Sequence, residues 1–185
     1  MKLSLRMLRP AQRVDAVPQV DVEALLAHGV NGVILDLDNT LTEWNQHALC
    51  PKIASWLAVL QSRGIKVCIV SNNKEKRVKP FAVGCQVPYI SGARKPRRKG
   101  FLRAMHLMGT TPETTAVIGD QVFTDVLGGN RLRMHTILVN PISRKEFLGT
   151  RLVRRLEGWV LRERRPLRLR KRLFRRNQEG GSASR

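Results

Sequence analysis

Acidic residues are scarce in this chain of 185 residues, which has 14 Asp and Glu residues against 34 Lys and Arg residues. The formal net charge at pH 7 is therefore +20. Such a balance favours polyanionic partners, either nucleic acid or an anionic membrane surface. Long apolar runs are absent as well, so we expect no transmembrane segment and no secretory signal.

Cysteine is also rare, and histidine forms no pattern. Cys50, Cys68 and Cys85 are odd in number and lack the spacing of a metal or redox site, which favours reduced thiols in a cytoplasmic protein. The four histidines are scattered, so the sequence predicts no zinc site. Residues 1–13 carry four basic residues and no acid, which leaves a mitochondrial presequence as an alternative.

The most informative segment is residues 33–42, which reads Val-Ile-Leu-Asp-Leu-Asp-Asn-Thr-Leu-Thr. Its apolar start is typical of a strand buried on both faces, and it places Asp36 and Asp38 at the carboxyl end. Open α/β sheets bind ligands at that edge. Residues two apart on an extended chain point the same way, so one carboxylate can attack while the other handles a proton. A strand that ends in a solvated Asp-Asn turn explains this segment equally well.

Two later segments also place polar residues directly after or beside apolar ones. Residues 65–70 predict a second strand, which ends at Ser71 and Asn72. The hydroxyl and amide groups of these two residues suit phosphate oxygens. Further along the chain, Lys95 precedes Pro96 in a loop before a predicted helix, where its ammonium group could neutralise an anion.

A fourth segment repeats the pattern of strand, tight turn and acids. Residues 115–118 are predominantly apolar and lead to Gly119 and Asp120, with Asp125 five residues further on. In a parallel sheet the carboxyl ends of the strands meet at one edge. Two more carboxylates are therefore expected near the first pair.

The four segments resemble, in type and order, the motifs of the haloacid dehalogenase (HAD) superfamily in its phosphatase branch. The matching residues are Asp36-x-Asp38-x-Thr40, Ser71-Asn72, Lys95-Pro96, and Gly119-Asp120 with Asp125. The similarity covers about residues 20–142, and the spacing is similar to that of the small class IIIA phosphatases of the YqeG type. The resemblance implies an α/β fold of Rossmann-like HAD type, with helices on both faces of a parallel sheet of about five strands that ends near residues 137–139.

The resemblance also implies a chemistry. Asp36 is expected to be the nucleophile that forms an aspartyl-phosphate. Asp38 is expected to protonate the leaving oxygen and then to take a proton from the hydrolytic water. Phosphate esters are anions that repel nucleophiles, and a bound magnesium ion would remove that repulsion. The implied Mg²⁺ ligands are Asp36, Asp120 and the backbone carbonyl of Asp38.

The remaining motif residues are expected to support these groups. Ser71, Asn72 and Lys95 would bind the phosphoryl oxygens, and Ser71 and Lys95 are counted with the catalytic residues. Asp125 would either assist the metal through water or orient Lys95. Thr40 is expected to be a supporting hydroxyl of the turn.

The segments between the motifs leave little room for a cap domain. From Thr40 to Ser71 the chain mostly encodes one helix, with apolar residues at i, i+3, i+4 and i+7 from Ile53 and a stop at Gly64. Residues 73–95 hold a short helix and a small strand at residues 87–90. Capless members of the superfamily resemble enzymes that act on phosphates presented by large partners, which themselves exclude water.

The basic excess is concentrated at the carboxyl-terminal end, and the predicted organisation follows from it. We expect a lead over residues 1–19, the HAD-like domain over 20–142, a basic amphipathic tail over 143–176 and a disordered terminus over 177–185. The favoured interpretation of the tail is membrane-surface binding. Nucleic-acid binding is the second, although aromatic residues make up only 5% of the chain. A merely solvated tail is the third.

Together these features predict a capless, Mg²⁺-dependent phosphomonoesterase in the cytoplasm, peripheral at the inner membrane face. A phospholipid monophosphate fits both the chemistry and the charge. Phosphatidylglycerophosphate phosphatases belong to the group that the chain resembles, so phosphatidylglycerophosphate is the expected substrate. The alternatives are a phosphatase acting on nucleic-acid ends or nucleotides, and a non-catalytic factor that binds RNA or the ribosome.

Overall fold

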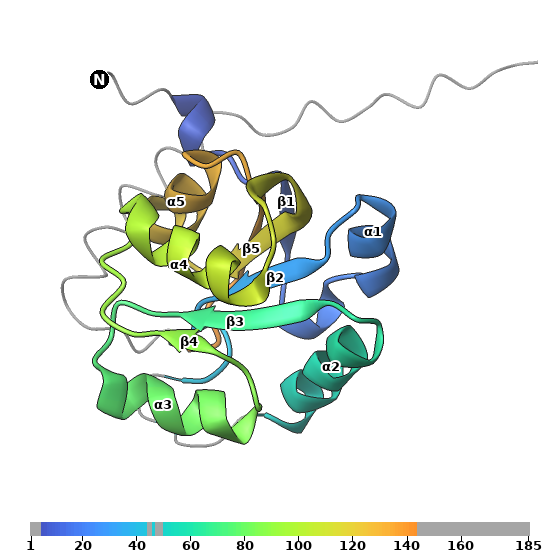
Figure 1. Cartoon of the computed structure of the whole chain (residues 1–185), viewed down its shortest axis with the longest axis vertical. Helices are drawn as coiled ribbons and strands as arrows, with labels where there is room; N and C mark the ends of the chain where they lie inside the picture. Colours follow the sequence, from blue (N-terminus) through green and yellow to red (C-terminus); the bar gives the residue numbers. More distant parts are fainter. Residues whose placement is uncertain (1–4, 44–45, 47–49, 144–185) are drawn as a thin grey trace, which may run out of the picture.

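Within residues 5–43, 46 and 50–143, which the computed structural model describes, six parallel strands form one sheet (Figure 1). In chain order they are β1 (Gln12–Val14), β2 (Gly32–Leu35), β3 (Lys66–Val70), β4 (Tyr89–Ile90), β5 (Thr115–Gly119) and β6 (His135–Val139). Their order in the sheet is β1-β6-β5-β2-β3-β4. Since β2 lies between β3 and β5, the ends of three motif-bearing strands are neighbours.

The sheet confirms the predicted Rossmann-like class and adds one strand. We expected about five strands, with residues 1–19 as a lead before the domain. Gln12 to Val14 of that lead instead pair with Ile137 to Val139 of β6 and form the edge strand β1. The sequence Gln-Arg-Val has one apolar residue in three positions, which is too little to predict a strand from the sequence.

Alternate strand residues face two separate layers of helices. Val33 and Leu35 pack with the helices α1 (Val22–Ala27), α2 (Pro51–Ser62) and α3 (Glu75–Gly84). Ile34, between them, packs with α4 (Arg98–Met108) on the opposite face, where α5 (Leu127–Asn130) also lies (Figure 1). Both faces are thus covered, as the continuous apolar strands predicted.

Short helical turns complete the connections between these elements. They are the 3₁₀ turns η1 (Leu5–Leu8), η2 (Val17–Gln19) and η3 (Pro112–Thr114), and the π-helical turn η4 (Val122–Val126). The insert between β2 and β3 contains α2, which buries Ile53, Trp56, Leu57 and Leu60 as predicted and is followed by Gly64 at φ +75°. The insert between β3 and β4 contains α3. Neither insert forms a cap domain in the part of the chain that the structure describes.

The predicted basic tail and disordered terminus lie almost wholly in residues 144–185, outside the described residues. Ser143 is the last residue with a described position. Among the helices of the described chain, none is long and apolar enough to cross a membrane.

Gly128 permits the close approach of α5 to α4. A Cβ atom at this position would lie 2.4 Å from Cε2 of the Phe101 ring, which is fully buried in the core. Gly84, at the end of α3, has open space around the same position.

We predict that Gly128→Ala lowers the free energy of unfolding by about 1–3 kcal/mol, because the Phe101 ring has no room to move in a packed core. Gly84→Ala is the matched control and is expected to raise it by about 0.4–1 kcal/mol by restricting the unfolded chain. Urea unfolding of both variants checks this. Equal stability of the two variants would contradict the packing described here.

Candidate active site

The predicted site residues follow the carboxyl ends of four strands, at one edge of the sheet. Asp36 follows β2, Ser71 follows β3, Lys95 lies in the loop after β4, and Asp120 follows β5. All four are buried, although they are polar or charged. Buried charges persist in folded proteins where they are paired or bind an ion, so the arrangement is that of a site rather than of a solvated edge.

Lys95 is the central cation of this edge. Its Nζ atom lies 2.5 Å from Asp36 Oδ1 and 2.7 Å from Asp125 Oδ1, and only 3% of its side chain is exposed. Burial by itself would lower the pKa of Lys95, but the charges of Asp125 and Asp36 outweigh it and raise the pKa. Lys95 is therefore an ammonium ion throughout the physiological pH range.

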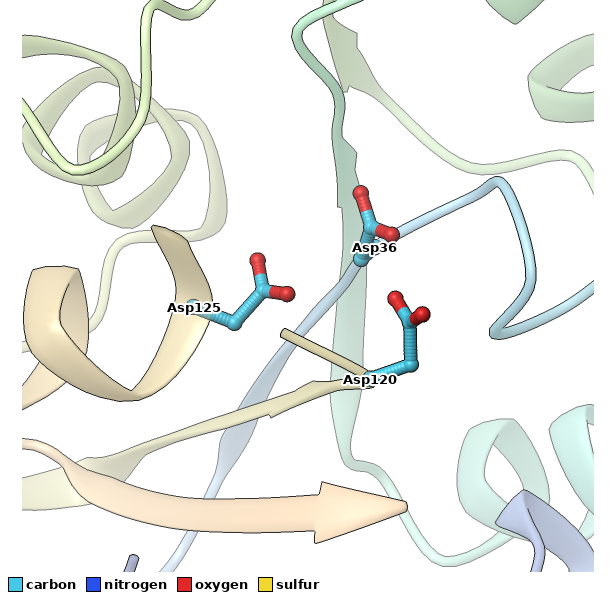
Figure 2. A group of neighbouring side chains, drawn as sticks. All are labelled: Asp36, Asp120 and Asp125. Atoms are coloured by element: carbon cyan, nitrogen blue, oxygen red, sulfur yellow. The ribbon is translucent and has the colours of Figure 1, made fainter. Parts of the chain in front are cut away.

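Asp36 and Asp120 form the second half of the cluster. Thr40 lies between them, with its Oγ1 atom 3.2 Å from Asp120 Oδ1 and 3.4 Å from Asp36 Oδ2. Figure 2 shows the carboxylates of Asp36, Asp120 and Asp125 directed toward a common space from three elements, and their ligand atoms lie within 4.8 Å of one another. The Thr40 hydroxyl thus contacts both carboxylates, and its supporting role in the reaction stays a prediction.

This donor set fits a magnesium ion. Magnesium prefers carboxylate and water oxygens and is commonly held by only one or two carboxylates. Since Lys95 neutralises the side of the cluster between Asp36 and Asp125, the side that Asp36 shares with Asp120 is the one suited to a divalent cation. The expected contribution of Asp38 was its backbone carbonyl, which stays a prediction.

Asp125 is placed by a special backbone. It lies on the π-helical turn η4, a conformation that is frequent at functional sites. A Cβ atom on Gly119 would lie 2.3 Å from the Asp125 carboxylate, so only glycine leaves room for it. Burial and the charge of Asp36 raise the pKa of Asp125, and Lys95 partly opposes this. Of its two expected roles, the ion pair at 2.7 Å supports the orientation of Lys95.

Ser71 and Asn72 serve the architecture of the site. The Ser71 hydroxyl accepts a hydrogen bond from the backbone N–H of Asn73 at 3.1 Å. The Asn72 side chain accepts from the Lys95 N–H at 2.6 Å and donates to the Lys95 carbonyl at 3.3 Å. Asn72 therefore fixes the backbone that carries Lys95, a role the sequence did not predict. Phosphate contacts by Ser71 and Asn72 stay predictions.

Asp38 is not among the three converging carboxylates and has hydrogen-bond partners of its own. Its Oδ2 atom accepts a hydrogen bond from Asn73 Nδ2 at 2.6 Å, and its Oδ1 atom accepts from Arg77 Nη2 at 2.8 Å. Burial raises the pKa of Asp38, and the hydrogen bonds from Arg77 and Asn73 partly counteract this. A raised pKa suits a group expected to donate a proton near neutral pH.

The sequence alone indicated no role for Arg77 or Asn73. Asn73 stands just before Lys74, the N-cap residue of α3, and Arg77 lies in the first turn of that helix. Their position directly after Ser71 and Asn72 is the signal that could have found them. The signal was hidden because basic residues occur throughout the chain, so that one more arginine on a helix has nothing to distinguish it.

The chain is similar to a family of hydrolases. A family model described as a haloacid dehalogenase-like hydrolase matches residues 18–133. The Bacillus subtilis (strain 168) protein named "Probable phosphatase YqeG" is 44% identical over 152 residues, which are 82% of this chain and 88% of that protein.

Two further relatives carry a more specific name. The chloroplastic phosphatidylglycerophosphate phosphatase 1 of Chlamydomonas reinhardtii is 30% identical over 79% of this chain and 58% of that protein. The chloroplastic/mitochondrial phosphatidylglycerophosphate phosphatase 1 of Arabidopsis thaliana is 29% identical over 83% of this chain and 47% of that protein. This chain thus spans about half of the length of these two relatives.

Solved structures share the fold at low identity. The cobalt-bound deoxy-D-mannose-octulosonate 8-phosphate phosphatase of Haemophilus influenzae has a TM-score of 0.50 and 16% identity, covering 73% of this chain and 89% of that chain. A hypothetical protein of Xanthomonas campestris has a TM-score of 0.51 and 17% identity, covering 68% and 74%. These similarities concern the fold alone.

We predict that Lys95→Met lowers the free energy of unfolding by about 3–5 kcal/mol in metal-free buffer at pH 8, because it leaves buried carboxylates without their cation. Without Lys95 the folded-state pKa of Asp125 rises further above its unfolded value, so the folded protein binds more protons and gains stability as the pH falls. The difference from wild type is therefore expected to be smaller at pH 5. Urea unfolding at both pH values tests this, and a difference independent of pH would contradict it.

Proposed function

This chain belongs to the haloacid dehalogenase-like hydrolase family and is one of its phosphatases, and we propose that it hydrolyses the phosphomonoester of a membrane phospholipid with Mg²⁺ as cofactor. The observation that carries the proposal is the contact between Asp36 and Lys95 at 2.5 Å, beside Asp120. It brings a carboxylate, a cation and a second acid together, and in the proposed reaction Asp36 is the nucleophile, Lys95 binds the phosphoryl group and Asp120 helps to hold the metal.

In the first half-reaction an oxygen of Asp36 attacks the phosphorus atom and forms an aspartyl-phosphate. The bond from phosphorus to the ester oxygen breaks, its electron pair stays on that oxygen, and Asp38 supplies the proton that neutralises it. In the second half-reaction Asp38 takes a proton from water, and the water oxygen displaces Asp36 from phosphorus. Lys95 holds phosphoryl oxygens beside the nucleophile throughout.

Asp36 and Asp120, with the Asp38 backbone carbonyl as the expected third ligand, would hold the magnesium ion. When bound, the ion supplies positive charge that offsets the negative charge on the phosphoryl oxygens. Asp125 keeps Lys95 in place by its ion pair at 2.7 Å. In this proposal Asp36 is the nucleophile and Asp38 carries the proton. Asp120 helps to hold the magnesium ion, and Asp125 holds the Lys95 ammonium group.

A lipid substrate is supported by the surface around the site as well as by the names of two relatives. Exposed basic residues follow the carboxyl ends of β3 and β4, the strands that deliver Ser71 and Lys95. This basic rim consists of Lys74, Lys76, Arg94, Arg97, Arg98 and Lys99. Basic residues close to an anionic bilayer contribute about 1 kcal/mol each to binding. Since no cap is found among the described residues, the bilayer itself could shield the reacting group from water.

We predict that the full chain releases phosphate from phosphatidylglycerophosphate in anionic vesicles when magnesium is present, and that Asp36→Asn abolishes release because no nucleophile remains. Terminally phosphorylated oligonucleotides and nucleotides are assayed beside the vesicles. Turnover confined to those two substrates would support the nucleic-acid alternative instead. No turnover of any substrate by a folded wild-type chain would favour a binding factor.

We predict that neutralising Arg97, Arg98 and Lys99 to Gln weakens binding to anionic vesicles by roughly 10²-fold, since about 3 kcal/mol of electrostatic attraction is lost. The same change of charge at Arg63, Lys66 and Arg133, which lie near the amino ends of the strands, is the control and is expected to have less effect. Co-sedimentation with the vesicles measures both. A chain ending at Ser143 measures the contribution of the tail to vesicle binding. Equal losses of binding in the two triple variants would show that the basic rim has no special part in it.

A further inference from the structure

Arg77 contacts Asp38, the connection between β2 and α2, and the Phe81 ring, near the sheet edge that holds the candidate active site. Its Nε and Nη2 atoms lie 3.0 and 2.8 Å from Asp38 Oδ1. The same guanidinium group donates to the backbone carbonyls of Glu43 at 2.9 Å and Gln46 at 2.5 Å, in the connection between β2 and α2. It also lies over the Phe81 ring, 4.8 Å from the centroid. A planar guanidinium group held on several sides has one orientation available to it.

The pair of Arg77 and Asp38 is largely shielded from water. The side chain of Arg77 is 16% exposed and that of Asp38 is 12% exposed. Charge-assisted hydrogen bonds that are shielded from water are short and directional. An exposed ion pair is weakened because water and salt screen its charges. The contact therefore determines where the Asp38 carboxyl lies.

Arg77 and Asn73 hold different oxygens of Asp38. Oδ1 accepts two N–H groups of Arg77, whereas Oδ2 accepts one N–H group of Asn73. A carboxyl oxygen has two lone pairs. Both lone pairs of Oδ1 are thus occupied, and one lone pair of Oδ2 has no partner among the residues that the structure describes. Oδ2 is the oxygen that can exchange a proton while Arg77 stays in place.

We propose that Arg77 is a positioning residue, which holds the Asp38 carboxyl so that Oδ2 transfers the proton to and from the reacting oxygens. The inference rests on the proposed function, because it concerns the proton carrier of that reaction. The proton on Oδ2 passes to the ester oxygen as the P–O bond breaks, and a proton from the hydrolytic water returns to Oδ2. Arg77 itself gives up no proton and touches no substrate.

The expected effect depends on the leaving group. An alkyl alcohol leaves slowly without a proton, whereas p-nitrophenolate leaves without one. Arg77→Gln is expected to lower kcat/KM, which reports formation of the aspartyl-phosphate, by about 10²-fold for an alkyl phosphomonoester such as phosphatidylglycerophosphate, at the lower end of what general acid catalysis contributes. For p-nitrophenyl phosphate we expect kcat/KM to change less than about threefold, because general acid catalysis has little to add there.

The experiment measures kcat and KM of the full chain for both substrates in wild type, Arg77→Gln, Arg77→Lys, Asp38→Asn and the double variant of Arg77→Gln with Asp38→Asn. Arg103→Gln, an exposed arginine on α4, is the matched control. We expect Arg77→Lys to restore part of the loss, and the double variant to be no slower than Asp38→Asn alone, since both changes remove one function.

The outcomes separate this inference from the proposed function. A wild-type chain that turns over neither ester would overturn both. If wild type is active, an equal loss of kcat/KM on the two esters in Arg77→Gln, or a double variant slower than Asp38→Asn, would show a merely structural arginine and overturn the inference alone. Thermal unfolding of each variant confirms that the compared proteins are folded.

Discussion

The buried ammonium group of Lys95 is the interaction on which the catalytic edge depends. Three acids, Asp36, Asp120 and Asp125, converge within 4.8 Å at the end of a sheet buried on both faces. Like charges at such distances repel strongly where water is excluded. Lys95 offsets two of them directly, and the backbone around it is held by the Asn72 amide and by the parallel strands. Without the Lys95 ammonium group, the repulsion between the buried carboxylates would be uncompensated.

The division of labour between the carboxylates follows from the elements that surround them. Asp36 and Asp38 leave the same strand two residues apart, yet they face different partners. Asp36 contacts Lys95 from the β4–α4 loop, whereas Asp38 contacts Asn73 and Arg77 at the start of α3. A carboxylate beside a fixed cation suits nucleophilic attack, and one held by a neutral and a cationic donor suits proton transfer. Two chemically identical side chains are thus suited to the two proposed roles.

The exposed residues that follow the carboxyl ends of β3 and β4 are mostly basic, although Glu75 lies among them. The basic rim follows the ends of β3 and β4, and the described chain offers no cap above it. An open edge of this kind suits a substrate that is part of a large anionic body. The proposed lipid phosphatase activity accounts for the open edge, the rim and the acid cluster together, because the bilayer would supply the cover that the described residues do not provide.

The sequence by itself determined the fold class, the helices of the inserts and most of the residues that meet at the sheet edge, because the apolar runs of β2, β3 and β5 each end in a polar motif. Tertiary structure alone decided three things. It paired the short segment Gln12 to Val14 with β6, since a three-residue strand is specified by its partner and not by its own pattern. It placed the Asn72 side chain in hydrogen bonds with the Lys95 backbone and Asp125 in an ion pair with the Lys95 side chain. It also brought Arg77 to Asp38 across 39 positions of the chain, a contact that depends on the direction in which α3 leaves the sheet and that no local periodicity records.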